Sequence, residues 1–388
     1  MLRKVGKRLS AFYLPHQTLT MKGMTELQRK NNFAAGPAAM PLPVLEEIQR
    51  DLTDYKGMGL SVMEMSHRSK AFDAIIRETE AALRRLMKIP EEYAVLFLQG
   101  GASLQFSMIP MNLARRGAVM DYALTGQFAR KAWEEGKRWG DARAITDGKA
   151  ENYTHITPIT PDMLDRDAAF LHITANNTIY GTAWNTLPET GDIPLVGDLS
   201  SIILGREYDI NRFGLIYAGA QKNMGPAGLT VVIVRRDLIP KSPDPIIPTM
   251  LQYGIMEKND SMYNTPPTFA IYVAGLIYRW VEEQGGVAAM EKRNAEKAKL
   301  LYDTIDRSAI FTGTACAEDR SPMNVTFTLP DEEMTADFLL LAEHRGLLNL
   351  KGHRAVGGCR ASLYNAVPLE AVQALTECMK DFEKGMRI

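Results

Sequence analysis

Three short segments contain residue types that together would hold a flat, phosphorylated ring. Lys222 follows an apolar run and is surrounded by glycine, alanine and proline in Gln221–Gly228. Small neighbours permit the close approach of a flat ligand, and partial burial would lower the pKa of the lysine toward nucleophilic competence. Asp198 lies in the apolar run Leu195–Leu199, and Gln99–Ser103 contains two glycines followed by a helical pattern. Backbone N–H groups at such a helix start form a ready phosphate site.

Each of these features has an ordinary structural explanation when it stands alone. A glycine pair after a strand is usually a turn, and an aspartate at a strand end often caps the turn that follows. The glycine spacing matches neither GxGxxG nor GxxxxGK[ST], which disfavours a dinucleotide fingerprint and a nucleotide P-loop.

The combination is more specific than its parts. A phosphate cradle, a buried acid and a lysine that forms a Schiff base are what pyridoxal phosphate requires. The acid keeps the pyridine nitrogen protonated, and the lysine shuttles a proton between Cα and C4′. Asp198 and Lys222 are 24 residues apart, enough for a turn and one adjacent strand that returns both groups to the same sheet edge. The polar segment His172–Thr178 is suited to hydrogen-bonding a ring substituent.

Six nearly continuous apolar runs predict the strands that position these residues. Runs that are apolar on both faces are typical of a parallel sheet covered by helices, although any single run also fits a short buried helix. Helical patterns over 70–88, Leu104–Arg115 and Gln127–Trp139 supply the connecting helices. The sequence therefore predicts an α/β fold with a mostly parallel sheet, whose ligand lies beyond the carboxyl ends of the strands. The six runs are Tyr93–Leu98, Ala118–Leu124, Ala168–Thr174, Leu195–Leu199, Leu215–Ala220 and Leu229–Val234.

After Gly285–Gly286 the pattern changes to that of a smaller α+β domain. We expect a large domain over 31–285, a small C-terminal domain over 286–388 and a basic N-terminal extension over 1–30. The extension is either a transit-like leader or, more simply, an over-long start or a mobile tail. Within the small domain, the pattern predicts helices over 287–307 and 334–346 and a final helix from Pro368. The strands expected there are Asn324–Leu329, Leu347–Leu350 and Cys359–Tyr364.

Composition and charge exclude several classes of protein. The chain is 46% hydrophobic and 23% charged, as in ordinary globular proteins. The longest apolar run, Phe269–Tyr278, is about half of the ~20 residues that a membrane span needs. Three cysteines without a CxxC motif argue against a disulfide framework or a zinc site, and favour the cytoplasm. Residues 1–30 carry seven basic residues and one acidic residue, which leaves 38 basic against 45 acidic residues elsewhere. This balance gives no electrostatic reason to expect nucleic-acid binding.

Four further motifs carry a resemblance to a known family. The segments Asn32–Ala38, Met65–Arg68, Asn264–Thr268 and Gly352–Ser362 resemble those of the phosphoserine aminotransferases, in order and at family-like spacing over about residues 31–388. That family belongs to the class V, fold-type-I pyridoxal-phosphate transaminases. The resemblance implies transamination between L-glutamate and 3-phosphohydroxypyruvate, giving O-phospho-L-serine and 2-oxoglutarate, with the 4-phosphohydroxythreonine reaction of vitamin B6 synthesis as a second role. It also implies a homodimer with shared active sites.

The resemblance assigns roles to the cofactor residues. Lys222 would carry the cofactor, and Asp198 would contact its pyridine nitrogen. Phe128 would stack on the ring where the family usually has tryptophan, and it keeps an aromatic face for that contact. The other expected cofactor contacts are Ala102, Ser103, Thr178 and Gln221, with Asn264 and Thr265 reaching the cofactor phosphate of the neighbouring subunit.

Both substrates implied by the resemblance carry two anionic ends. Arg360 resembles the residue that holds the α-carboxylate, because the planar fork of arginine binds such groups bidentately. The expected cluster for the distal anion is His67, Arg68, His353 and Arg354. Many family members have an arginine just after the glycine-rich turn, where this chain has Ala102–Phe106. That departure weakens the expected preference for phosphate over carboxylate.

Three other functions stay open at this point. A cysteine desulfurase on the same fold would need an exposed thiolate on a mobile loop, for which Cys359 is the only cysteine near the predicted site. An alanine–glyoxylate or serine–pyruvate transaminase would not need the distal-anion cluster. A non-enzymatic cofactor-binding regulator would not need both Asp198 and Lys222.

Overall fold

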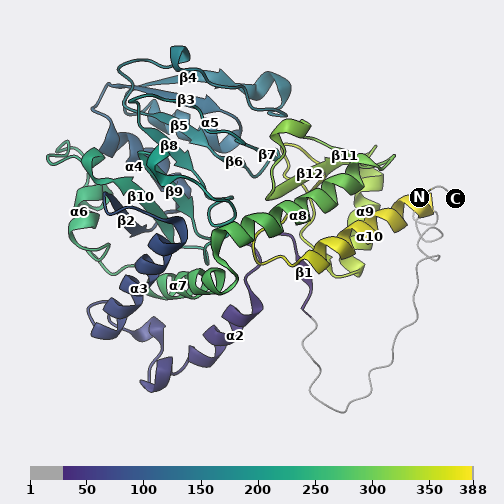
Figure 1. The fold of residues 1–388 in the computed structure, drawn as a ribbon, viewed down its shortest axis with the longest axis horizontal. Coiled ribbons are helices and arrows are strands. Elements are labelled where there is room, and N and C mark those ends of the chain that lie inside the picture. Colours follow the sequence, from purple (N-terminus) through teal and green to yellow (C-terminus); the bar gives the residue numbers. More distant parts are fainter. Residues whose placement is uncertain (1–28, 387–388) are drawn as a thin grey trace. The chain divides into compact units, whose positions relative to one another are not determined.

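A seven-stranded sheet forms the centre of the computed structural model, which describes residues 29–386 (Figure 1). Its strand order is β2-β10-β9-β8-β5-β3-β4. β10 runs antiparallel to both of its neighbours, and the remaining strands are parallel to one another. The strands are β2 (Tyr93–Leu98), β3 (Val119–Leu124), β4 (Asp141–Asp147), β5 (Leu171–Thr174), β8 (Leu195–Asp198), β9 (Leu215–Gly219) and β10 (Thr230–Arg235).

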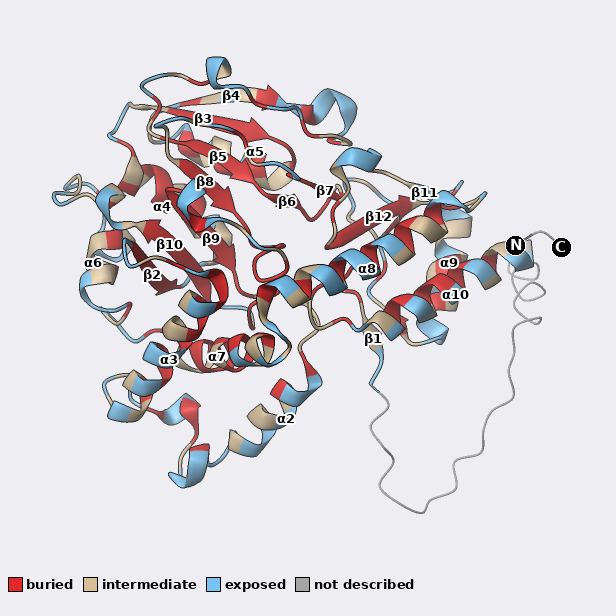
Figure 2. Ribbon diagram, viewed as in Figure 1, coloured by how far each residue is buried: buried red, intermediate tan, exposed pale blue. Residues whose placement is uncertain are grey.

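Helices cover both faces of this sheet because its central strands are apolar on both sides. In β2, Val95 and Phe97 pack into one core with α3 (Lys70–Met87) and α7 (Thr268–Glu283). The alternate residues Leu96 and Leu98 pack into a second core with α4 (Gly101–Leu113) and α5 (Gln127–Gly136). Figure 2 shows the strands other than the edge strand β4 almost wholly buried between these layers. The mostly parallel α/β sheet expected from the sequence is confirmed.

A third core lies in the C-terminal part of the chain. It gathers apolar side chains from the three-stranded sheet β11-β12-β14 and from α8, α9 and α10, and it includes Phe33 from the beginning of the described chain. β1 (Asn31–Asn32) pairs in parallel with β13 (Leu347–Leu348). The segment near residue 33 therefore lies against the C-terminal layer. The elements of this part are α8 (Gly286–Asp306), β11 (Thr312–Gly313), β12 (Asn324–Thr328), α9 (Glu332–His344), β14 (Cys359–Ser362) and α10 (Leu369–Met386).

Two elements differ from the sequence expectation or extend it. β4 is an additional strand, at the sheet edge, where exposed and buried residues alternate and no apolar run marks it. The apolar run Phe269–Tyr278 lies in α7, a helix buried along most of its length. No helix within residues 29–386 is long and apolar enough to cross a membrane. The expected extension over 1–30 lies outside the described residues except for its last two positions, and the domain boundary at 285/286 stays a prediction.

The remaining regular elements are short. They are α2 (Leu42–Asp51), α6 (Tyr253–Lys258), β6 (Asn176–Asn177) and β7 (Thr182–Ala183), with 3-10 turns at Tyr55–Gly57, Val62–Glu64, Gly148–Glu151, Pro161–Met163, Ile210–Arg212, Arg236–Leu238, Thr249–Leu251 and Ala317–Asp319.

Candidate active site

Lys222 lies just beyond the carboxyl end of β9, in a turn that follows Gly219. Its Nζ donates a hydrogen bond to Thr178 Oγ1 at 2.7 Å. Burial lowers the pKa of Lys222 to about 8, although the Asp198 carboxylate opposes this shift and Arg360 adds to it. A neutral hydroxyl at hydrogen-bonding distance stabilises the ammonium less than a carboxylate would. With a pKa of about 8, roughly a tenth of the amine is neutral and nucleophilic at pH 7, far more than for an ordinary lysine.

Glycine at position 36 lets the N-terminal segment approach this lysine. Gly36 has φ +141°, and a Cβ there would lie 3.2 Å from Lys222 Cγ. The backbone N–H of Ala38 donates to the Gln221 carbonyl oxygen at 2.9 Å. The motif around Asn32–Ala38 thus packs directly against the predicted site, and Gln221 is held beside Lys222.

Asp198 ends β8 and lies next to Tyr217 of β9 in the parallel register. Only 5% of Asp198 is exposed, and its Oδ1 accepts a hydrogen bond from Ser200 N at 2.9 Å. Tyr217 in turn shares a 2.9 Å hydrogen bond with His172 Nε2 from β5. Burial, and secondly the negative charge of Asp198, raise the pKa of Tyr217, while burial lowers the pKa of His172 to about 3. The acid therefore lies at the end of a buried, uncharged Tyr–His pair.

An aromatic ring and a helix start complete this edge of the sheet. The Phe128 ring, in the first turn of α5, has its centroid 5.2 Å from Lys222 Nζ. α4 begins directly after β2 with Gly100 at φ +85°, and it packs against Tyr217 through Phe106. Its first backbone N–H groups, including those of Ala102 and Ser103, have no partner within the helix. They form the anion-binding end expected for a phosphate.

Arg360 connects the C-terminal layer to this site. It lies on β14, and its Nη1 donates to the Thr178 carbonyl oxygen at 3.3 Å. Thr178 thereby contacts Lys222 through its hydroxyl and Arg360 through its main chain. Burial lowers the pKa of Arg360, but an arginine keeps its charge. The Arg360 guanidinium and the Lys222 amine thus bind the same residue, Thr178.

The loop that carries His353 and Arg354 also faces this region. Burial first, then the positive charges of Arg360, Arg354 and Lys131, lower the pKa of His353. His353 Nδ1 accepts a hydrogen bond from Ala355 N at 3.2 Å. Lys131 was missed by the sequence reasoning, since a lysine on an amphipathic helix looks like any solvated surface charge. Its spacing of three residues from Phe128 is the signal that could have found it.

Four predicted residues have no hydrogen bond to Lys222 within residues 29–386. His67 and Arg68 precede α3, and His67 Nε2 is buried without a hydrogen-bond partner. Asn264 and Thr265 are exposed, and Gln99 Nε2 lies 3.5 Å from the Thr265 carbonyl oxygen. Within residues 29–386 no hydrogen bond links these four residues to Lys222 or Arg360. Their roles stay predictions.

Cys359 is unsuited to nucleophilic chemistry. It lies on β14 with 1% of its surface exposed, and burial raises the pKa of its thiol to about 12. A desulfurase needs an accessible thiolate, which this position does not provide. Among residues 29–386, no cluster of three or more histidine, cysteine, aspartate or glutamate side chains could hold a metal ion.

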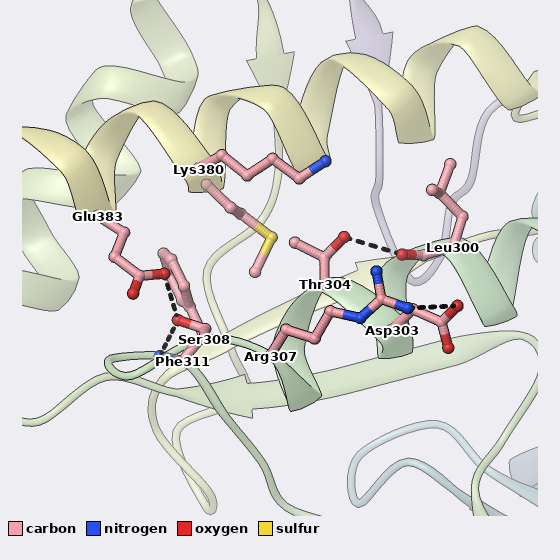
Figure 3. Close-up of a pocket in the computed structure, with 9 residues that line it drawn as sticks. Leu300, Asp303, Thr304, Arg307, Ser308, Phe311, Lys380 and Glu383 are labelled. Atoms are coloured by element: carbon pink, nitrogen blue, oxygen red, sulfur yellow. Dashed lines mark hydrogen bonds and ion pairs between the residues drawn. The ribbon is translucent and has the colours of Figure 1, made fainter.

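A separate pocket of about 180 Å³ lies between α8 and α10 (Figure 3). Arg307 Nη2 lies 4.0 Å from Asp303 Oδ2, and Ser308 Oγ donates a hydrogen bond to Glu383 Oε2 at 2.8 Å. Four polar residues around the pocket thus pair with one another, and none of the predicted site residues lines it. We assign no ligand to this pocket.

Comparison with known proteins agrees with a site built around a nucleophilic lysine, a buried acid and an anion-binding helix start. The family described as "Aminotransferase class-V" matches residues 30–375. A phosphoserine aminotransferase of Geobacillus kaustophilus is 53% identical over 359 residues, which cover 92% of this chain and 99% of the relative. The chain therefore belongs to the class-V aminotransferases and, within them, to the phosphoserine aminotransferase family.

Solved structures support the same assignment. The phosphoserine aminotransferase from Bacillus circulans subsp. alkalophilus has a TM-score of 0.89 and 47% identity, covering 92% of this chain and 99% of that one. The phosphoserine aminotransferase from Trichomonas vaginalis, determined with bound pyridoxal phosphate, has a TM-score of 0.86 and 41% identity, covering 91% and 100%. The fold-type-I architecture expected from the sequence is confirmed.

The donor set of this chain fits pyridoxal phosphate. The lysine amine is partly deprotonated near neutral pH and has a hydroxyl partner. A buried carboxylate and an aromatic ring lie beside it, and a helix start stands at the same sheet edge. These groups supply the covalent anchor, the partner of the ring nitrogen, a stacking face and the phosphate-binding N–H groups.

Proposed function

We propose that this chain catalyses pyridoxal-phosphate-dependent transamination between L-glutamate and 3-phosphohydroxypyruvate, giving O-phospho-L-serine and 2-oxoglutarate. The observation that carries the proposal is the double contact of Thr178 with the Lys222 amine and the Arg360 guanidinium. An amino acid whose carboxylate binds Arg360 would have its Cα close to Lys222 Nζ. This arrangement would bring the base, Lys222 Nζ, to the Cα–H bond of the substrate that loses its proton.

Each residue at the sheet edge would have a distinct role. Lys222 would bind the cofactor and, once released by the incoming amino acid, would move the proton at the substrate Cα. Its pKa of about 8 suits that proton transfer near neutral pH. Asp198 would hold a proton on the ring nitrogen, and Phe128 would cover one face of the ring. Bound pyridoxal phosphate supplies the electron sink for the Cα–H bond.

The remaining cofactor contacts would fix the orientation of the ring. Thr178 and Gln221 would hydrogen-bond substituents of the cofactor, and Gln221 is already held by Ala38. The first N–H groups of α4, at Ala102 and Ser103, would hold the phosphate. Because the N–H groups of Ala102 and Ser103 are fixed by the start of α4, they need little ordering when the cofactor phosphate binds.

The two anionic ends of the substrates would be held by separate cations. Arg360 would bind the α-carboxylate as a planar fork. His353 and Arg354, with His67 and Arg68, would bind the distal carboxylate or phosphate. Burial is the main cause of the lowered pKa of His353, and the positive charges of Arg360, Arg354 and Lys131 add to it. That added positive charge supports this assignment, because an anion would neutralise it.

We infer that the active form is a homodimer with shared sites. Five of the eight exposed large apolar side chains of the described residues lie in two segments, 58–63 and 246–263, which a second copy could cover. Asn264 and Thr265 directly follow the second segment and are exposed. In such a dimer they would reach the cofactor phosphate of the other subunit. The exposed apolar residues of the two segments are Met58, Met63, Ile246, Met250 and Tyr263.

We also infer a large domain over 31–285, a small domain over 286–388 and a cytoplasmic location. The separate cores of the sheet region and the C-terminal layer support the division, although Phe33 packs in the C-terminal core. Three free cysteines, two of them buried, fit a reducing compartment. The 4-phosphohydroxythreonine reaction stays a prediction.

A spectral titration of the purified holoenzyme tests the proposed reaction. Glutamate should remove the visible absorbance band of the lysine-bound cofactor. 3-Phosphohydroxypyruvate should restore the band, and pyruvate should not. Restoration by pyruvate or glyoxylate to the same extent would contradict the phosphoserine assignment and favour the alanine–glyoxylate type. A band unaffected by glutamate would contradict transamination altogether and favour a cofactor-binding regulator.

A further inference from the structure

Lys131 lies beside the Phe128 ring and has no role among the functional residues predicted from the sequence. It is three residues after Phe128 on α5, so the two side chains occupy one face of the helix. Lys131 Nζ is 5.7 Å from the centroid of the Phe128 ring, and Lys222 Nζ is 5.2 Å from the same centroid. The predicted stacking ring is therefore in contact with two ammonium groups, and one of them belongs to the predicted catalytic lysine.

The ion pairs on α5 distinguish Lys131 from its basic neighbours. Arg130 pairs with Asp147 at 2.5 Å, and Lys137 pairs with Glu134 at 2.7 Å. Lys131 is exposed and has no hydrogen-bond or carboxylate partner among residues 29–386, so only the Phe128 ring holds it. An unpaired cation beside a ligand site is free to bind an anion without first breaking an ion pair.

The charge of Lys131 also acts on His353, which lies between β13 and β14. Burial is the main cause of the lowered pKa of His353, and the positive charges of Arg360, Arg354 and Lys131 lower it further. The start of α4, by contrast, contributes no cation, because Gly101–Leu113 contains neither lysine nor arginine. Positive charge on the Phe128 side of the site therefore comes from α5.

We propose that Lys131 binds the distal phosphate of the phosphorylated 2-oxo acid and contributes to the preference for phosphate over carboxylate. The inference rests on the proposed function and adds a residue to it. Arg360, which contacts Thr178 beside the catalytic amine, is placed for the α-carboxylate. Lys131 lies beside the Phe128 ring, and its charge acts on His353, so it is placed for the other end of the substrate.

The chemistry of lysine fits this role. Its ammonium is a compact point charge on a flexible stem, which adapts to a phosphate that arrives with the substrate. A phosphate at neutral pH carries nearly two negative charges, and a carboxylate carries one. The Coulomb attraction of Lys131 is therefore about twice as large for the phosphorylated substrate as for glutamate at equal distance. One cation can in this way discriminate between two substrates that share one site.

The test compares Lys131→Gln, Lys131→Arg and the control Lys137→Gln in the holoenzyme. Lys137 is a lysine of the same helical segment, and its substitution removes one equal charge away from the ring. We expect Lys131→Gln to raise the KM for 3-phosphohydroxypyruvate about tenfold, the size of one partly exposed charge-assisted hydrogen bond. The KM for glutamate should change less than about threefold, and kcat should be nearly unchanged.

Two further measurements separate substrate binding from a structural role. The inhibition constant of inorganic phosphate should rise with Lys131→Gln and stay near the wild-type value with Lys131→Arg and Lys137→Gln. Cofactor affinity, measured by titrating pyridoxal phosphate into apoprotein, should be the same in all variants. If Lys131 only held the Phe128 ring, cofactor affinity and both KM values would change together, and the inference would be overturned.

The outcomes also separate this inference from the proposed function. If the wild-type enzyme turns over 3-phosphohydroxypyruvate selectively and Lys131→Gln keeps that selectivity, only the role of Lys131 is refuted. If the wild-type enzyme shows no selectivity for the phosphorylated acid, the proposed function fails, and the role of Lys131 fails with it.

Discussion

Replacement of Lys222 by methionine should stabilise the apoprotein near neutral pH, although Lys222 is the residue on which activity depends most. The folded chain holds an ammonium group in a partly buried position, with a threonine hydroxyl as its hydrogen-bond partner. A methionine of similar length fills much of the same space without a charge. Lys222→Met therefore isolates the electrostatic penalty of the catalytic amine from its chemistry.

The magnitude follows from the pKa of Lys222. It falls from 10.5 to about 8 on folding, and one pH unit corresponds to about 1.36 kcal/mol. The buried charge thus destabilises the fold by at most about 3 kcal/mol, and by about 2 kcal/mol after allowance for solvent screening. Loss of the hydrogen bond to Thr178 costs about 1 kcal/mol. The net expectation at pH 7 is an apoprotein about 1 kcal/mol more stable than wild type.

The sign of the effect changes with pH. Because the folded-state pKa lies below the unfolded-state value, the unfolded chain binds more protons between pH 8 and 10.5. Wild-type stability therefore gains from this group as pH rises through that window, and the penalty is fully present below pH 8. Above about pH 10.5 the neutral amine keeps its hydrogen bond to Thr178, so Lys222→Met should there be the less stable protein by about 1 kcal/mol.

Urea unfolding of both apoproteins at pH 7, 8, 9 and 10 measures this difference. Other titrating groups act equally on both proteins and cancel in the difference. Lys137→Met is the matched control, since Lys137 is partly exposed and paired with Glu134. Its effect should stay within about 0.5 kcal/mol between pH 7 and 9. A Lys222→Met difference that does not vary with pH would refute a buried, destabilised ammonium at this position.

Two further predictions concern the surroundings of Lys222. Tyr217→Phe should destabilise the protein by about 1–3 kcal/mol in urea unfolding, because it removes the only hydrogen-bond partner of the His172 imidazole within residues 29–386. An unchanged midpoint would contradict the buried pair. Arg360→Lys preserves the charge but should raise the KM for glutamate about tenfold or more, because a lysine cannot form the bidentate fork. An unchanged KM in steady-state kinetics would exclude Arg360 as the residue that binds the α-carboxylate.

Local patterns predicted much of the fold because parallel strands are buried on both faces. The runs that contain β2, β5 and β8 are continuous and apolar, so their positions could be read without knowledge of their neighbours. β4 could not be read in this way. It lies at the sheet edge, where one face meets solvent, and Asp141, Arg143 and Asp147 interrupt any apolar run.

The site residues that local sequence patterns mark could be predicted, whereas contacts between distant segments could not. Lys222 and Asp198 stand at strand ends, and the sheet topology brings such positions to one edge. The contact between Thr178 and Arg360 spans 182 residues and depends on how the C-terminal layer packs. No spacing rule predicts it. Lys131 and Tyr217 were missed for a similar reason, since each gains its significance from a neighbour on another element.

Charge at the site connects its stability with its specificity. Burial is the main cause of the lowered pKa of Lys222 and of His353. The positive charges of Arg360, Arg354 and Lys131 add to these shifts, and within residues 29–386 Asp198 is the one carboxylate that opposes the shift of Lys222. Such an excess of positive charge is unfavourable until anions neutralise it. The cofactor phosphate and the doubly anionic substrates supply those anions. Binding therefore gains free energy from repulsion that the fold already contains, and a dianion gains more of it than a monoanion. Specificity for phosphate then needs no pocket shaped for phosphate alone.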